Sequence, residues 1–150
     1  MNFSRFNAYQ PYMLSLFRFM TGLLLLQFGV AKIFKFPALP YFANPPPLII
    51  AAGTLELILG ALLVLGLFTR TVAFILAGEM AFAYFLGHMF KSPEPVFLPL
   101  NNGGTAAILF CFACFYLWVA GGGAVSVDAV LERRNKDDQF DGDFLQRATK

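Results

Sequence analysis

The chain has 150 residues, of which 58% are hydrophobic and only 13% are charged, and its formal net charge is +2. This composition excludes an ordinary soluble domain and indicates one all-α domain that is integral to a membrane. The small net charge, without a basic patch interleaved with stacking aromatic residues, excludes nucleic-acid binding.

Four apolar runs predict a bundle of four membrane-spanning helices, at about residues 14–34, 48–68, 72–90 and 105–120. A helix of about 20 residues covers roughly 30 Å, which is the hydrocarbon thickness of a typical bilayer. We interpret the first run as a retained helix, because it is too long for the core of a signal peptide and no small-residue cleavage site follows it. After residue 124 the sequence turns polar up to residue 150, and we expect a brief amphipathic turn and then a loosely ordered tail.

Glycines share a helical stripe with a charged residue in each of the first two spans. Gly22 and Gly29 are seven residues apart, and Lys32 follows three residues later. Gly53, Glu56 and Gly60 follow one another at intervals of three and four. Such stripes let two helices approach closely and direct Glu56 to a neighbouring helix instead of lipid. We expect Lys32, and Arg18 near the other end of the first span, to extend their cationic groups to the headgroups.

The basic residues are more numerous at the termini and the short middle loop than in the two Pro-rich connections, 35–47 and 91–102. The positive-inside rule therefore places both termini in the cytoplasm. Counting residues from each span end then predicts a polar pocket in the outer half of the bundle, under the two connections. The residues expected to line this ligand-binding pocket are Glu56, Gln27, Lys32, His88, Asn101 and Asn102.

Two interpretations stay open for the polar residues of the spans. Glu56 is either a proton-carrying or ligand-orienting group, or a buried carboxylate that pairs with Lys32 or bonds to Gln27. His88 either relays a proton or binds a quinone oxygen, or is a polar residue of the interface. Glu79, the second intramembrane acid, belongs by depth to the inner half, where it forms a separate site or has a structural role. One histidine and scattered carboxylates predict no metal site.

Cys111 and Cys114 form a C-x-x-C motif in the fourth predicted span. A thiol pair beside a polar pocket is typical of a thiol-disulfide oxidoreductase that reduces quinones, and a nearby cation would activate a thiol. The chain has no second cysteine pair to pass electrons onward, and cysteine in an apolar helix commonly acts as a small hydrophobic residue. Both interpretations stay open.

Four sequence blocks in this order resemble the DoxX family of small four-span membrane proteins: RFMTGLLLLQFGVAKIF, GTLELILGALLVLGLFTR, LPLNNGG and GGGAVSVD. The resemblance covers nearly all of residues 16–128. It implies a four-helix bundle in a bacterial cytoplasmic membrane and an association with redox chemistry, as a subunit of quinone-linked oxidation or a partner of oxidant-defence enzymes. The sequence departs from the family where a Glu often opens the last span, because Gly104 and Thr105 stand there.

These observations favour a membrane subunit or partner of a redox-related system, without an independent catalytic activity. The expected partners are the bilayer, a quinone or other small molecule, and a soluble redox enzyme. One alternative is a thiol-disulfide or quinone oxidoreductase that uses Cys111 and Cys114. Another is a small-solute or proton carrier that uses Glu56.

Overall fold

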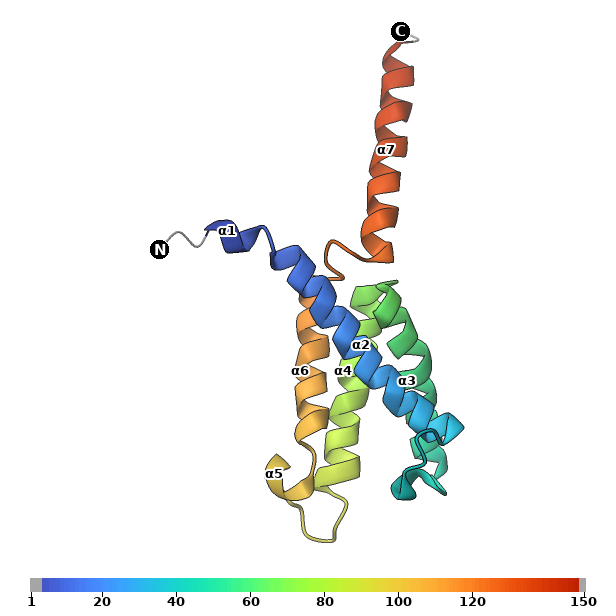
Figure 1. Cartoon of the computed structure of the whole chain (residues 1–150), viewed down its shortest axis with the longest axis vertical. Helices are drawn as coiled ribbons and strands as arrows, with labels where there is room; N and C mark the ends of the chain where they lie inside the picture. The colour runs from blue at the N-terminus through green and yellow to red at the C-terminus, as the bar shows by residue number, and fades with distance from the viewer. Residues whose placement is uncertain (1–3, 149–150) are drawn as a thin grey trace.

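The computed structural model describes residues 4–148, with side chains described for residues 6–40 and 42–140, and this part of the chain is helical without any strand (Figure 1). The helices in chain order are α1 (Ser4–Asn7), α2 (Gln10–Phe34), η1 (Pro40–Phe42), α3 (Pro47–Leu65), α4 (Thr69–Phe82), η2 (Ala83–Met89), α5 (Pro99–Asn102), α6 (Thr105–Ala120) and α7 (Val127–Ala148). Of these, η1 is a single 3-10 turn, and η2 is a π-helical continuation of α4.

Within the described residues, three helical segments are long and apolar enough to cross a membrane: Gln10–Phe34, Pro47–Leu65 and Thr69–Met89. The apolar helix α6 lies where the fourth span is predicted, but its 16 residues make it shorter. Most large apolar side chains on these helices are exposed, as a lipid solvent requires. The all-α membrane fold is therefore confirmed, and the first span begins at Gln10 instead of residue 14.

Helices α2 and α3 pack closely along their length because glycines from each helix face the backbone of the other. A Cβ atom at Gly22 would lie 2.8 Å from the backbone nitrogen of Val64, and one at Gly60 would lie 2.8 Å from that of Leu26. The predicted glycine stripes thus form a helix–helix contact. Helix α4 packs mainly against α6.

The fully buried leucines at the centre of the core come from four different helices: Leu25, Leu63, Leu76 and Leu117. Figure 1 shows the α2–α3 pair and the α4–α6 pair separating toward the end that carries α5 and η1. At the opposite end, α7 projects away from the other helices.

The expectation of a loosely ordered tail after residue 135 is wrong, because helix α7 continues through this segment to Ala148. Strong helix formers cluster at the start of this helix, from Leu131 to Arg134, and Asp128 stands in the first turn, where an acid favours the helix dipole. The described side chains of residues 130–140 are exposed. The helix therefore forms on local propensity and not on packing against the bundle.

Replacing Gly29 with alanine should destabilise the protein by about 1–3 kcal/mol, because the new methyl group would overlap the backbone of Leu57. Gly78 is the matched control, since nothing lies within 4 Å of the Cβ position there. Gly78→Ala should be neutral or stabilising by up to about 1 kcal/mol, through helix propensity. Unfolding of both variants in detergent micelles by a titration with SDS measures the difference. Equal stabilities for the two variants would contradict the close α2–α3 contact.

Candidate functional site

A buried ion pair joins the last turn of α2 to the middle of α3. Lys32 Nζ lies 2.7 Å from Oε1 and 2.6 Å from Oε2 of Glu56. The Glu56 side chain is 3% exposed and that of Lys32 is 11% exposed, so both side chains are largely shielded from solvent. The ring of Phe42, in η1, has its centroid 5.7 Å from the same nitrogen, which adds a cation–π contact. Glu56 is thus directed to a neighbouring helix, as the glycine stripe predicts. Its carboxylate forms an ion pair with Lys32, which is one of the arrangements that the sequence left open.

Glu79 is the one intramembrane carboxyl group in the described residues that has no partner. Both of its oxygens are buried without a hydrogen bond. It lies on α4 within electrostatic range of Glu56 and Lys32, and of Cys114 on α6. Counting along the spans predicts an inner-half location for Glu79, and that prediction stays open. The structure places Glu79 within electrostatic range of the Lys32–Glu56 ion pair, without a hydrogen bond to it.

Cys111 and Cys114 are free thiols on the buried face of α6. Cys114 is 0% exposed and Cys111 is 8% exposed. Thiol–disulfide exchange requires a second reactant to reach the sulfur in line with the attacking thiolate, and the low exposure of both thiols restricts this approach. The contacts therefore favour the role of small hydrophobic residues.

The other residues of the predicted pocket do not join the ion pair. Gln27 is exposed on α2. His88 Nδ1 lies 3.1 Å from the carbonyl oxygen of Asn102, whose amide donates to Val96 O at 2.7 Å. Asn101 is exposed at the same end. This cluster fastens the second Pro-rich connection to η2 and α6, and Figure 1 shows α5 on the side away from η1. The two connections therefore do not cover one common pocket.

Sequence reasoning missed a set of three side chains that cap helix ends at the opposite end of the protein. Arg18 is 3% exposed and donates to the carbonyl oxygens of Leu63 and Val64, at the C-terminal end of α3. The same guanidinium donates to Gly122 O at 2.9 Å and Val125 O at 2.7 Å. Arg18 thus does not extend to the headgroups, because four carbonyl groups surround it.

Arg70 and Asp128 act in the same way on two further helices. Arg70 donates to the carbonyl oxygens of Trp118 and Val119 at the end of α6. Asp128 accepts hydrogen bonds of 2.8 Å from the backbone N–H groups of Phe68 and Thr69, where α4 begins. Each cap carries the charge that complements its helix end, a cation at the C-terminus and an anion at the N-terminus. The signal in the sequence was that Arg18, Arg70 and Asp128 each lie at an end of a block that resembles the DoxX family.

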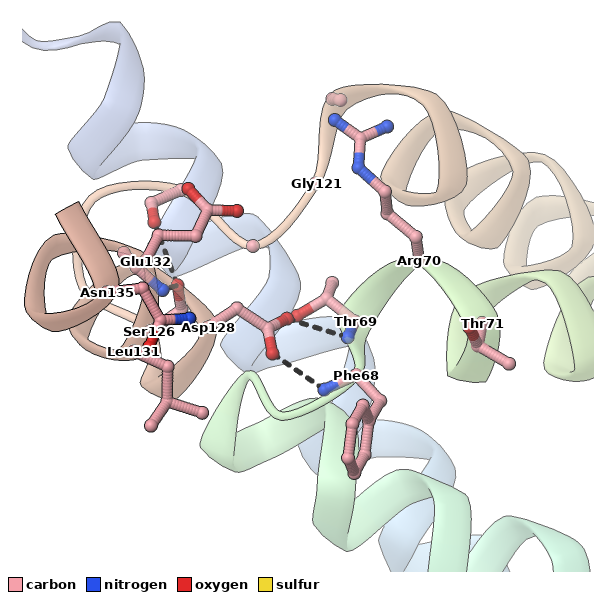
Figure 2. Close-up of a pocket in the computed structure, with 14 residues that line it drawn as sticks. Phe68, Thr69, Arg70, Thr71, Gly121, Ser126, Asp128, Leu131, Glu132 and Asn135 are labelled. Atoms are coloured by element: carbon pink, nitrogen blue, oxygen red, sulfur yellow. Dashed lines mark hydrogen bonds between the residues drawn. The ribbon is translucent and has the colours of Figure 1, made fainter. Parts of the chain in front are cut away.

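A cavity of about 430 Å³ opens beside these caps, between the start of α4, the loop after α6 and the first turns of α7 (Figure 2). A second cavity of about 400 Å³ is lined by residues of the first Pro-rich connection and Lys35. Neither cavity is lined by Glu56 or by His88.

Comparison with known proteins agrees with the resemblance seen in the sequence. The DoxX family matches residues 13–89. A Haemophilus influenzae protein described only as uncharacterized is 37% identical over 123 residues, which cover 80% of this chain and 91% of that protein. No solved structure matches the chain. The chain is a membrane protein that belongs to the DoxX family.

Proposed function

We propose that this protein is a membrane subunit or partner of a redox-related system, and that the cluster of Lys32, Glu56 and Glu79 binds a quinone-class molecule in its reduced, hydroxyl-bearing form. The redox association rests on the resemblance to the family. The observation that carries the binding proposal is the Glu79 carboxyl group, buried without a partner beside an ion pair.

The chemistry of the cluster supports a ligand that donates hydrogen bonds. A carboxyl group offers acceptor oxygens in either protonation state, and a buried acceptor without a partner costs about 1–3 kcal/mol, which a ligand hydroxyl would recover. Hydroquinones carry two hydroxyl groups on an apolar body, so they dissolve in the bilayer and reach a helix bundle from the side. The slight exposure of Lys32 offers an opening at the edge of the cluster.

The test measures quinone that remains with the protein after purification in a mild detergent, by solvent extraction and mass spectrometry. Glu79→Leu, which removes the acceptor oxygens, should lower the amount of quinone per protein by up to about tenfold, since one hydrogen bond contributes about 0.5–1.5 kcal/mol and about 1.4 kcal/mol is a factor of ten. Glu94→Gln is the matched control, because Glu94 is an exposed carboxylate in the second connection. Equal quinone content in Glu79→Leu and wild type would refute the proposal.

We further propose that the protein lies in a bacterial cytoplasmic membrane with both termini in the cytoplasm and with α6 as a fourth span. The beginning of α2 and the projecting α7 lie at the same end in Figure 1, which an even number of crossings requires. Basic residues gather at that end, in the first turn of α4 and on α7: Arg70, Arg133, Arg134 and Lys136. A fluorescent protein fused after residue 150, which folds only in the cytoplasm, should be bright. A dark fusion that is nonetheless expressed would reverse the orientation.

A further inference from the structure

We propose that the cavity beside the helix caps binds the zwitterionic headgroup of an amino-phospholipid, a phosphate with a primary ammonium group. The cavity has room for a headgroup, since small-molecule pockets have volumes of about 300–1,000 Å³. It lies where α3 and α6 end and α4 begins, which is the level of the membrane interface. This proposal is independent of the quinone site, which lies in the interior of the protein.

Charges of both signs line the cavity on opposite sides. Figure 2 shows Arg70 beside the loop at Gly121 and Glu132 across the cavity from it, on α7. Within the described residues, the hydrogen bonds of Arg70 use Nη1 only, so Nη2 and Nε retain donors. Glu132 forms no ion pair with the described residues. An anion alone would meet the carboxylates of Glu132 and Asp128, and a cation alone would meet Arg70, whereas a zwitterion complements both.

A buried hydroxyl group in the cavity wall lacks a partner, which is independent evidence for a ligand. Thr69 is 1% exposed, it lines the cavity, and its Oγ1 has no hydrogen bond within the described structure. The loop backbone comes close to this hydroxyl, because a Cβ at Gly122 would lie 2.8 Å from Thr69 Oγ1. Buried hydroxyl groups normally have a partner, and a phosphate oxygen entering the cavity would supply one.

Apolar side chains at the cavity favour a lipid over a water-soluble zwitterion. Phe68 and Leu131 line the cavity and are 65% and 46% exposed. Trp118, whose ring packs 5.2 Å from that of Phe74, lies on the nearby end of α6, where tryptophan typically marks the interface. A headgroup in the cavity would therefore place its acyl chains beside apolar surface.

Native mass spectrometry of the protein released from nanodiscs tests the proposal, with phosphatidylethanolamine and phosphatidylglycerol of identical acyl chains in equal amounts. The wild type should retain phosphatidylethanolamine at least about tenfold better, because only this lipid has an ammonium group for Glu132. Glu132→Gln should abolish the preference. Glu94→Gln, at the opposite end, should keep it. Glu132 caps no helix, so the variant leaves the fold intact.

A second arm distinguishes the source of the headgroup. Glycerophosphoethanolamine, which has the same charged groups without acyl chains, should not displace the lipid at millimolar concentration. Displacement by this soluble compound would overturn the assignment to a membrane lipid. Equal retention of both lipids by the wild type, or an unchanged preference in Glu132→Gln, would overturn the headgroup site itself.

Discussion

Replacing Arg18 with alanine should destabilise the folded protein by about 3–5 kcal/mol, the largest loss that we expect from a single substitution at the helix ends. The guanidinium is 3% exposed and is the shared donor for carbonyl groups on α3 and on the loop after α6. Without it, the carbonyl groups of Leu63, Gly122 and Val125 lose a charged donor at a buried or partly buried location. Reversible unfolding with SDS in mixed micelles measures the free energy.

Two further variants test this prediction. One keeps the positive charge at position 18 but changes its geometry, and the other removes an exposed arginine as a control. Arg18→Lys should recover only part of the loss, because an ammonium group lacks the planar fork that reaches several carbonyl groups at once. Arg133→Ala should cost less than about 0.5 kcal/mol, since Arg133 makes one exposed hydrogen bond of 3.3 Å to Ala124. If Arg18→Ala were as mild as Arg133→Ala, the capping role of Arg18 would be wrong.

Lys32→Met should also destabilise the protein by about 3–5 kcal/mol, because it leaves the carboxylate of Glu56 without its partner in an apolar interior. The side chain of Glu56 is only 3% exposed, so water cannot replace the lost ammonium group without opening the α2–α3 contact. The same unfolding measurement applies.

The double variant Lys32→Met/Glu56→Met provides the decisive comparison. Since apolar side chains often replace a buried ion pair without net loss, its stability should return to within about 1 kcal/mol of the wild type. Quinone retention in this stable double variant then shows whether the pair serves binding as well as folding. A double variant as unstable as Lys32→Met alone would mean that the cost does not come from the unpaired charge.

Features with a local signature were predictable from the sequence. The stripe of Gly53, Glu56 and Gly60 is set by helical spacing alone, so it predicted which face of α3 is buried. The partner Lys32 was predictable because the matching stripe on α2 carries glycines at the same seven-residue interval. The apolar runs located the helices within a few residues for the same reason.

The set of residues that form the site was less predictable. The depth of a residue in the membrane does not determine which way its side chain faces. Counting residues gives the height of Gln27 in the membrane, but the rotation and tilt of α2 decide which way it faces. Gln27 is consequently exposed although its depth is similar to that of Glu56. The caps were missed because the acceptors of Arg18 are backbone carbonyl groups, which every residue has and no sequence pattern marks.

Arg18 is far from two of its acceptors along the sequence, and this distance affects how the protein assembles during synthesis. Gly122 and Val125 follow Arg18 by 104 and 107 positions, so the first span leaves the ribosome long before the last loop exists. At about 5–20 residues per second, the guanidinium waits roughly 5–20 s for these two acceptors. The carbonyl groups of Leu63 and Val64 follow Arg18 by only 45 and 46 positions, so α3 supplies acceptors first, and completion of the set of four depends on the arrival of the C-terminal loop.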